Sequence, residues 1–351
     1  MSREQLKIAV IGTGANGASI GADMIRAGHD VTFIEQWPDH VAAMREKGLV
    51  VHLPTETQVT PVRALHLCEV AELRQTFDIV FTSVKTYDTR WVAELAKPLM
   101  REDSVFVGLQ NGMTIDAVAE ILGAERSIGA VLGIAANMFT PGEVVRQVTP
   151  AETWISVGTM SGERTERLEQ VARVLSASAR VEISEDIRSS KWMKLLANIP
   201  EMLPSAILNV PLLTAAKAPG MREVMDAAAR EAYALAVDLG ITMLPIFGKT
   251  AAEVPAGDQY AIDLLEAVLE HYSKPDTRVA VLQDWDKHRR AELDAFSGYI
   301  VAKRHERGER APVNELILEV AERIERGELQ PSEGNARLLV EGFARLGAYA
   351  S

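Results

Sequence analysis

Residues 7–17 read KIAVIGTGANG, and this stretch decides the fold of the first half of the chain. The apolar run Lys7–Gly12 has the composition of a buried strand, and the helical pattern Asn16–Ala27 follows it directly. The three glycines between them have the spacing G-x-G-x-x-G, which permits a tight turn, close approach of a pyrophosphate and close helix–strand packing. We therefore predict a dinucleotide-binding turn. Its expected cofactor contacts are Gly12, Gly14, Asn16 and Gly17.

The second predicted strand, Asp30–Glu35, ends in a carboxylate 23 residues after Gly12. An acid at this place in a dinucleotide-binding unit accepts hydrogen bonds from the adenosine ribose, whereas a 2′-phosphate would meet a like charge. Residues 36–38 read Gln-Trp-Pro and offer no compensating cation. Glu35 therefore predicts NAD as the preferred cofactor, with NADP as the weaker alternative.

The rest of the first half alternates strand and helix patterns. A helix is predicted at Pro38–Lys47, and the strands Asp78–Lys85 and Ser104–Gln110 flank the helical stretch Thr89–Met100. This alternation favours a parallel sheet covered on both faces. Two further expectations concern less regular segments: a pair of extra strands inserted in the same sheet at Leu49–Leu67, and antiparallel strands closing the domain around Val144–Val157.

The pattern changes after Glu185, where strand-like alternation gives way to apolar residues at three- and four-residue spacing. The predicted helices are Ile187–Ile199, Pro219–Leu239, Ala261–His271, Val279–Arg307 and Val313–Arg326. We therefore predict an α/β chain with a Rossmann-type doubly wound sheet over residues 1–185. An all-α C-terminal domain over residues 186–351 would supply substrate binding and dimer contacts.

Composition excludes several classes of protein. The 351 residues include 37 basic and 49 acidic side chains, a net charge of −12 that disfavours nucleic-acid and anionic-membrane partners. The single cysteine excludes a disulfide framework, and the seven histidines lack metal-ligand spacing, so no metal site is predicted. No run of 18 apolar residues and no signal-peptide pattern occurs, so we expect a cytoplasmic protein.

Four further segments follow the glycine turn in a recognisable order. They are Val84-Lys85, LQNGM at 109–113, KWMKLLAN at 191–198, and LQD at 282–284 with ELD at 292–294. With the glycine turn, they make the chain resemble the ketopantoate reductase family over roughly residues 7 to 320. The resemblance implies a homodimer that reduces a 2-oxo acid to a 2-hydroxy acid, with a nicotinamide cofactor bound between a Rossmann domain and a helical domain.

The resemblance also implies roles for particular residues. Lys194 would be the general acid/base, Glu292 the acidic partner that holds the substrate hydroxyl, and Asn198 a substrate contact. Lys85 and Asn111 would line the cofactor side of the cleft. Elementary chemistry agrees, because hydride delivery to a carbonyl builds negative charge on oxygen, which a positioned ammonium stabilises and protonates.

Helix spacing supports two polar stripes. Lys194 and Asn198 are four residues apart and share one helix face, while Lys191 is expected to be a surface or structural lysine. The second stripe is expected on the predicted helix Val279–Arg307, where polar residues recur at every fourth position: Asp284, His288 and Glu292. The alternative interpretation of both stripes is a set of solvated charges on exposed helix faces.

Three positions depart from the family pattern. Glu35 stands where NADPH-using members carry a basic residue, Met202 where the family has asparagine, and Ala280 where it has serine. Met202 lies eight residues after Lys194, and Ala280 lies twelve before Glu292, so both are expected to line the substrate pocket. An apolar lining predicts a substrate bulkier than ketopantoate.

Other functions remain open at this level. One is a dehydrogenase that works oxidatively on a bulkier hydroxy acid, and another is a dinucleotide-binding sensor without catalysis. A 3-hydroxyacid dehydrogenase has the same two-domain plan, but its catalytic signature is not what this chain carries. Measured hydride transfer would separate an enzyme from a sensor. The stretch Pro245–Tyr272 is predicted to add a helix.

Overall fold

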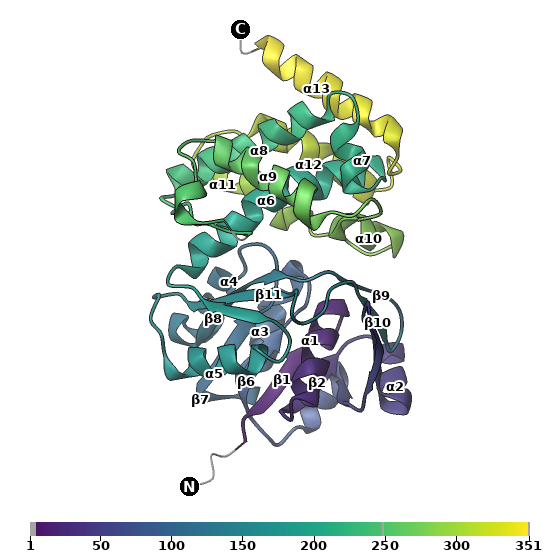
Figure 1. Ribbon diagram of the computed structural model, residues 1–351, viewed down its shortest axis with the longest axis vertical. Helices are drawn as coiled ribbons and strands as arrows, with labels where there is room; N and C mark the ends of the chain where they lie inside the picture. The colour runs from purple at the N-terminus through teal and green to yellow at the C-terminus, as the bar shows by residue number, and fades with distance from the viewer. Residues whose placement is uncertain (1–4, 248, 350–351) are drawn as a thin grey trace. The chain divides into compact units, whose positions relative to one another are not determined.

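The structure is a computed structural model that describes residues 5–247 and 249–349 (Figure 1). The chain divides into two compact units, Met1–Lys191 and Trp192–Ser351, and the division falls within helix α6 (Ile187–Leu208). The described part of the first unit combines strands and helices, and that of the second is helical. Within the described residues, no helix has both the length and the apolar character needed to cross a membrane.

The first unit contains an eight-stranded sheet in the order β12-β11-β8-β7-β6-β1-β2-β5. Its strands are β1 (Lys7–Ile11), β2 (Asp30–Glu35), β5 (Arg63–His66), β6 (Phe77–Thr82), β7 (Met100–Gly108), β8 (Ser127–Gly133), β11 (Trp154–Thr159) and β12 (Arg180–Ile183). The strands from β5 to β8 are parallel, whereas β11 runs antiparallel to β8 and β12 runs parallel to β11. The carboxyl ends of β7, β6 and β1 therefore lie side by side at one edge of the sheet.

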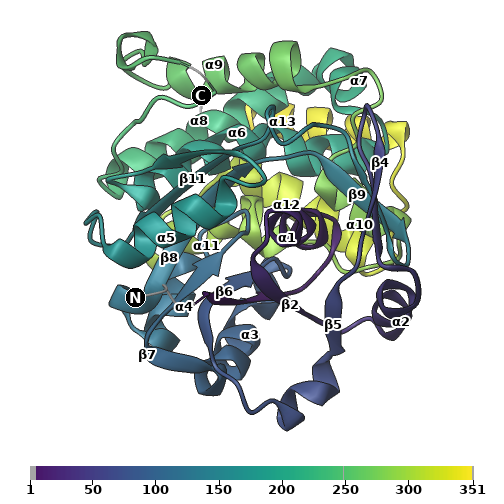
Figure 2. The ribbon, with the colours of Figure 1, turned by 60° about the horizontal axis from the view of Figure 1, so that its bottom comes forward.

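Helices cover both faces of this sheet (Figure 2). They are α1 (Ala15–Arg26), α2 (Pro38–Lys47), α3 (Thr89–Ala96), α4 (Ile115–Leu122) and α5 (Glu166–Leu175). Successive residues of β1 face opposite layers: Ile8 and Val10 pack with the apolar residues of α1 and α5, and Ala9 and Ile11 with those of α3 and α4. The predicted α/β class, a doubly wound sheet followed by a helical region, is confirmed.

The segment Leu49–Leu67 differs from the prediction of two strands added to the main sheet. It forms three strands, of which only β5 joins that sheet. A second, four-stranded sheet has the order β4-β3-β10-β9 and consists of β3 (Leu49–His52), β4 (Thr57–Thr60), β9 (Ala136–Thr140) and β10 (Glu143–Arg146). Burial alternates along β4 and β10. Such strands suit a sheet with one solvated face and not one buried on both faces.

The antiparallel strands predicted around Val144–Val157 are present, but they fall in different sheets. β11 pairs with β8 in the main sheet, and β10 pairs antiparallel with β9 in the small sheet. β10 also runs parallel to β3, which lies about ninety residues earlier in the chain.

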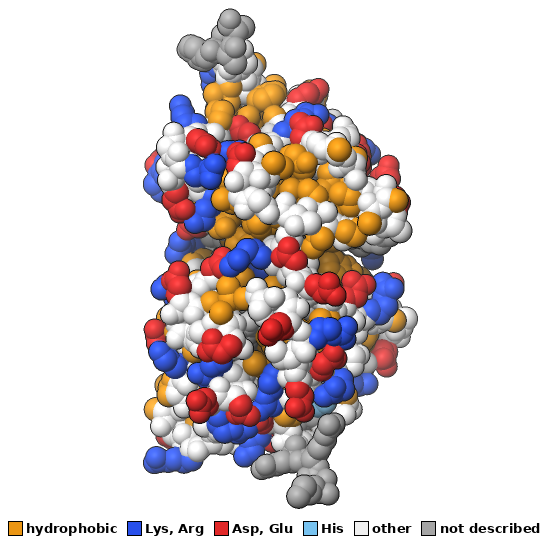
Figure 3. Space-filling model, turned by 90° about the vertical axis from the view of Figure 1, so that its left-hand side faces the viewer, with side chains coloured by type: hydrophobic (Ala, Val, Ile, Leu, Met, Phe, Trp, Pro, Cys, Tyr) orange, Lys and Arg blue, Asp and Glu red, His pale blue; other side chains and the backbone are white. Residues whose placement is uncertain are grey.

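Acidic and basic side chains are interspersed over the first unit on the face drawn in Figure 3, so the negative charge is spread on that face.

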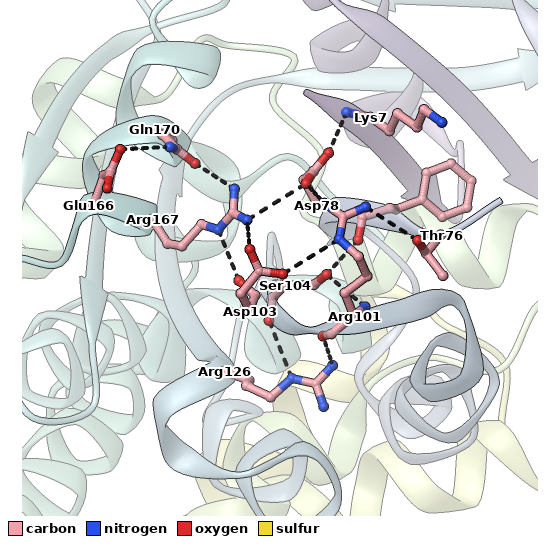
Figure 4. A network of polar contacts seen from close by, with 11 residues as sticks. Lys7, Thr76, Asp78, Arg101, Asp103, Ser104, Arg126, Glu166, Arg167 and Gln170 are labelled. Atoms are coloured by element: carbon pink, nitrogen blue, oxygen red, sulfur yellow. Dashed lines mark hydrogen bonds and ion pairs between the residues drawn. The ribbon is translucent and has the colours of Figure 1, made fainter. Parts of the chain in front are cut away.

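A charged network joins the amino ends of three strands to helix α5 (Figure 4). Asp78, at the start of β6, accepts a hydrogen bond of 2.8 Å from the Lys7 backbone N–H and forms an ion pair with Arg101 of β7. Arg167 of α5 lies 3.6 Å from the same carboxylate. This network therefore ties the sheet together at the edge opposite the glycine turn.

The second unit is arranged around one helix. α8 contacts α7, α9, α11, α12 and α13. The helices are α7 (Leu212–Lys217), α8 (Met221–Asp238), α9 (Gln259–Ala267), α10 (Ala280–Asp286), α11 (Ser297–Glu306), α12 (Pro312–Glu325) and α13 (Ala336–Tyr349). Glu231 of α8 accepts hydrogen bonds from the backbone N–H groups of Val313 and Asn314, and so caps α12. α9 lies in the stretch predicted to add a helix.

The predicted helix Val279–Arg307 is wrong as a single element. α10 ends at Asp286, and His288 adopts a left-handed φ of 54°. The backbone N–H of Arg289 then bonds to the carbonyl of Asp284 at 2.9 Å, and that of His288 to Trp285 at 3.0 Å. These two bonds form the Schellman pattern that ends helices, here with histidine in place of the usual glycine.

A tertiary contact stabilises this break. One carboxylate oxygen of Glu325, in α12, accepts hydrogen bonds from the Trp285 indole at 2.7 Å and from the Ala291 backbone N–H at 2.8 Å. Glu292 consequently begins a separate 3₁₀ turn, Leu293–Ala295. The predicted stripe through Asp284 and Glu292 therefore does not exist as one helix face. The helical spacing from Ala280 to Glu292 fails for the same reason.

Candidate functional site

The three glycines of the turn have three different environments. Gly12 has a left-handed φ of 83°, and a Cβ there would lie 2.4 Å from Val84 Cγ1. A Cβ on Gly17 would lie 2.3 Å from the Gly12 carbonyl oxygen, so this glycine lets α1 approach the turn closely. A Cβ on Gly14 would meet no described atom within 4 Å. The open side of the turn is therefore at Gly14, where a ligand would approach the backbone.

The start of α1 has the features of an anion-binding site. Gly14 is the N-cap with extended backbone, no side chain caps the first turn, and that turn contains no acidic residue. The free N–H groups and the helix dipole favour a negatively charged ligand. Asn16 Oδ1 is buried and has no hydrogen-bond partner among the described residues. These residues fit the pyrophosphate of a dinucleotide.

Glu35 is bound by its own chain on both carboxylate oxygens. One oxygen accepts hydrogen bonds from the Thr13 backbone N–H at 2.7 Å and the Thr13 hydroxyl at 3.0 Å. The other accepts from the backbone N–H groups of Gln36 at 2.9 Å and Trp37 at 3.0 Å. The side chain is 7% exposed. Glu35 therefore joins the glycine turn to the start of α2, a role that the sequence did not indicate.

His40 supports the same turn from α2. The backbone N–H of Gly142 donates to His40 Nδ1 at 2.7 Å, so the ring proton lies on Nε2, which donates to the Thr13 carbonyl at 2.9 Å. Burial lowers the pKa of His40, against the opposing effects of its bond to Thr13 and of the Glu35 charge. A neutral histidine thus links the glycine turn to the β9–β10 turn. Sequence reasoning missed it because Gly142 is 102 residues away.

The carboxyl edge of the sheet brings the other expected cofactor residues next to the turn. Lys85 follows β6 and Asn111 follows β7, and both side chains are partly buried. Gln110 connects the two loops, because its Nε2 donates to the Val84 carbonyl at 2.8 Å and to the Thr89 hydroxyl at 2.9 Å. Gln110 Oε1 is buried and has no partner among the described residues.

Lys191 proves to be a buried structural lysine. Its ammonium donates to the carbonyl oxygens of Gln110 at 3.0 Å and Ala130 at 3.1 Å, which follow β7 and lie within β8. The residue is 4% exposed. Burial lowers the pKa of Lys191 to about 8, and the charge of Asp116 opposes this shift. Lys191 therefore ties the beginning of α6 to the carboxyl edge of the sheet.

In the second unit, α6 presents a polar face that is partly buried at Lys194 and fully buried at Asn198. Lys194 and Asn198 are one turn apart, and the amide of Asn198 is fully buried with no hydrogen-bond partner for either of its atoms among the described residues. Lys194 Nζ lies 5.2 Å from the centre of the Phe247 ring. Burial lowers the pKa of Lys194, and the charge of Glu201 opposes this shift. Met202, one turn beyond Asn198, is partly buried.

Glu201 extends this face and was missed by sequence reasoning. It lies seven residues after Lys194 and three after Asn198, so all three share one side of the helix. The side chain is 4% exposed, and burial raises the pKa of Glu201 to about 7 against the opposing charge of Lys194. A glutamate within the largely apolar stretch LLANIPEMLPSAIL was the available signal.

Glu292 and Ala280 are less closely related than predicted. Glu292 is 9% exposed and precedes the 3₁₀ turn, while Ala280 is the first residue of α10 and is partly buried. The break at His288 separates them, so helix geometry no longer places Ala280 on the face that carries Glu292. Helical spacing therefore no longer supports the prediction that Ala280 lines the substrate pocket.

Comparison with known protein families identifies the chain. Residues 8–160 match the model described as Ketopantoate reductase PanE/ApbA, and residues 186–325 match its C-terminal counterpart. The 2-dehydropantoate 2-reductase of Archaeoglobus fulgidus is 29% identical over 326 residues, which cover 92% of this chain and 98% of the relative. That of Mesorhizobium japonicum is 26% identical, with coverage of 83% and 89%.

Solved structures agree. The PanE/ApbA family ketopantoate reductase from Ralstonia eutropha is 26% identical with a TM-score of 0.78, covering 92% of this chain and 99% of its own. D-mandelate dehydrogenase with NADH and anilino(oxo)acetate has a TM-score of 0.81 and the same coverage, but at 19% identity it shows the fold alone. The chain belongs to the ketopantoate reductase family and is a nicotinamide-dependent oxidoreductase that acts on CH–OH groups.

Proposed function

We propose that this enzyme interconverts a 2-oxo acid and the 2-hydroxy acid, with Lys194 as general acid in reduction. The observation that carries the proposal is the buried amide of Asn198, which has no hydrogen-bond partner among the residues that the structure describes and lies one helical turn after Lys194. An unsatisfied buried polar group costs roughly 1–3 kcal/mol. A bound oxo acid would supply the missing partners, because its oxygens accept hydrogen bonds from an amide and an ammonium.

A reduced nicotinamide, when bound, would supply the hydride in this mechanism. Lys194 donates a proton from Nζ to the carbonyl oxygen as negative charge develops there. Asn198 holds the substrate through its amide, and Glu292 accepts a hydrogen bond from the substrate hydroxyl. The turn at Gly14 and the start of α1 would hold the pyrophosphate, with Lys85 and Asn111 beside it.

One observation favours the oxidative direction as a second candidate. Burial lowers the pKa of Lys194, which increases the fraction of neutral amine at neutral and alkaline pH. A neutral amine accepts the proton from a hydroxyl group, as dehydrogenation requires. Initial rates in both directions, measured from pH 6 to pH 10, would establish which one the enzyme favours.

The role of Lys194 is tested by substitution. Lys194→Ala should lower kcat by roughly 10²–10⁴-fold, the usual value of general acid–base help, while NADH affinity stays nearly unchanged. Lys217→Ala, at an exposed lysine of the same unit, is the matched control. Glu292→Gln should raise KM more than it weakens cofactor binding. Near wild-type kcat in Lys194→Ala would remove this residue from its role.

The proposal includes a preference for NAD(H), supported by the charge of Glu35. Because its four hydrogen bonds hold the carboxylate in place, the negative charge would remain beside an incoming 2′-phosphate. Calorimetry should give tighter binding of NADH than of NADPH, and Glu35→Gln should reduce the difference. Thr13→Val, which removes one of the same hydrogen bonds but no charge, is the control. Tighter NADPH binding by the wild type would contradict the preference.

We further propose that ketopantoate is not the best substrate. Because helical spacing no longer supports Ala280 as a pocket residue, this proposal rests on Met202, an apolar residue on the helix that carries Lys194 and Asn198. Oxo acids with a larger apolar part, such as phenylglyoxylate, should therefore have the higher kcat/KM. Met202→Asn should shift the ratio toward ketopantoate. A wild-type kcat/KM for ketopantoate of about 10⁵ M⁻¹s⁻¹ or more, above that of every larger oxo acid, would refute this.

The assembly proposed is a homodimer. A structural neighbour at 17% identity and a TM-score of 0.71 is named as the dimeric ketopantoate reductase from Staphylococcus aureus. Light scattering after size-exclusion chromatography should give twice the chain mass of 38.3 kDa. A monomeric mass at micromolar concentration would contradict the proposal.

A further inference from the structure

We propose that Glu201 is a positioning residue for Lys194: it stabilises the ammonium and returns a proton to it after each reductive turnover. The inference rests on the proposed function, because it assumes that Lys194 is the proton donor. The matched family segment KWMKLLAN ends before this residue, so the resemblance assigns Glu201 no role.

The geometry is that of one helix stripe, in which Lys194 is partly buried and the other two residues are buried. Lys194, Asn198 and Glu201 occupy positions i, i+4 and i+7 of α6, which extends from Ile187 to Leu208 and contains Pro200 and Pro204 in its interior. At a rise of about 1.5 Å per residue, the stripe is about 10 Å long, which the lysine and glutamate side chains can largely span. Glu201 is 4% exposed and Asn198 is fully buried. Asn198 lies between the other two residues along the helix.

The two charged groups act on each other. Within the described residues, Lys194 is the charge that acts on Glu201, and Glu201 is the charge that acts on Lys194. From the neighbouring segment, Phe247 contributes a ring and not a charge to the surroundings of Lys194. A buried carboxyl with a pKa of about 7 is protonated in part at neutral pH. It can therefore hold a proton in reserve where a solvated glutamate could not.

The proton balance of the cycle closes. In reduction, the N–H bond of Lys194 breaks and an O–H bond forms on the substrate, which leaves a neutral amine. The O–H bond of the Glu201 carboxyl then breaks, and its proton re-forms the ammonium through a bridging water molecule or a polar group of the bound substrate. Water reprotonates Glu201. In oxidation, the same transfers run in reverse, and Glu201 accepts the proton that Lys194 removes from the hydroxyl.

The test is the pH dependence of kcat with phenylglyoxylate and ketopantoate as probes, for wild type, Glu201→Gln and Lys194→Ala. Without the carboxylate the ammonium is less favoured, so in Glu201→Gln the alkaline limb of reductive kcat should move to lower pH by about one unit. At pH values above both limbs, this shift corresponds to an about tenfold lower kcat. Glu201→Asp should restore the limb in part.

A matched control separates positioning from stability. Glu231→Gln changes another glutamate of the same unit, which is partly buried and caps α12. This variant should lower Tm without moving the alkaline limb.

A substrate-independent readout is infrared difference spectroscopy between pH 5.5 and pH 8.5. The wild type should show a protonated-carboxyl band that titrates near neutrality and is missing from Glu201→Gln.

The outcomes distinguish the two proposals. If Lys194→Ala retains activity, the proposed function fails, whatever Glu201 does. If Lys194→Ala is inactive but Glu201→Gln keeps the wild-type limb, the inference fails and the proposed function stands. A shifted limb together with the titrating band supports the inference. A shifted limb with no such band would overturn the proton reserve and leave only electrostatic support of the ammonium.

Discussion

Replacing Lys191 with methionine should reduce the change in unfolding free energy that the protein shows between pH 7 and pH 10. In the folded chain, the Lys191 ammonium is buried against the carbonyl oxygens of Gln110 and Ala130, and burial lowers its pKa to about 8. Methionine has a similar length and no charge. Because the shift lowers the pKa of a base, the unfolded chain binds more protons than the folded chain between about pH 8 and pH 10.5.

The magnitude follows from the pKa difference. A drop from 10.5 to about 8 corresponds to about 3.5 kcal/mol, at about 1.4 kcal/mol per pKa unit, and this penalty on the folded state is nearly complete at pH 7. At pH 10 the lysine of the unfolded chain is itself partly neutral, and about 1 kcal/mol remains. Between pH 7 and pH 10 the wild type should therefore gain about 2.5 kcal/mol relative to Lys191→Met.

Urea unfolding of both proteins at pH 7 and pH 10 measures this double difference. The hydrogen bonds that methionine cannot donate to Gln110 and Ala130 weaken the variant at both pH values, so they cancel in the comparison. A difference in unfolding free energy that stays constant across this pH range would refute the assignment of Lys191 as a buried, destabilised cation.

Two further predictions concern the first unit. Gly17→Ala should lower Tm and weaken NADH binding at least tenfold, because its Cβ would lie 2.3 Å from the Gly12 carbonyl oxygen. Gly14→Ala should weaken NADH binding, measured by calorimetry, but leave Tm unchanged. Equal losses of Tm in the two variants would contradict this distinction. Asp78→Asn should lower the unfolding free energy by about 1–3 kcal/mol in urea, through the loss of charged contacts to Arg101 and Arg167. Its kcat should stay at the wild-type value, and a parallel loss of kcat would show that this network reaches the site.

Sequence predicts the first βαβ unit closely because the deciding contacts are local. Strand β2 and helix α2 have the predicted bounds, since Pro38 begins the helix and Gly48 ends it with a left-handed φ of 80°. The small sheet could not be predicted in this way. Its strand β3 pairs with β10, about ninety residues later, and no local pattern specifies such a partner.

The broken helix at His288 shows a second limit. Its residues keep helical spacing through Val279–Arg307, and histidine rarely adopts the left-handed conformation that ends α10. The compensation comes from Glu325, forty residues away from Trp285, which binds both sides of the break. Periodicity reports which side chains are apolar, but it does not report a tertiary hydrogen bond that makes an alternative backbone more stable.

The candidate site residues show the same difference between local features, which a sequence reveals, and long-range packing, which it does not. The glycine turn could be predicted because its spacing G-x-G-x-x-G is contained in six consecutive residues between a strand pattern and a helix pattern. The burial of Lys191 and Glu201 could not, because a lysine or glutamate on a helix is usually solvated and only the packed fold removes its water. Both residues therefore became candidates only once their surroundings were known.

Glu35 shows why a motif and a structure can assign different work to one carboxylate. An acid at the end of the second strand indicates ribose binding, yet all four of the observed hydrogen bonds to Glu35 come from Thr13, Gln36 and Trp37. A ribose hydroxyl would have to share or displace one of these donors, whereas repulsion of a 2′-phosphate needs only the charge. Selectivity by exclusion therefore suits this geometry better than selectivity by attraction. On this argument, Glu35→Gln should improve NADPH binding more than it weakens NADH binding.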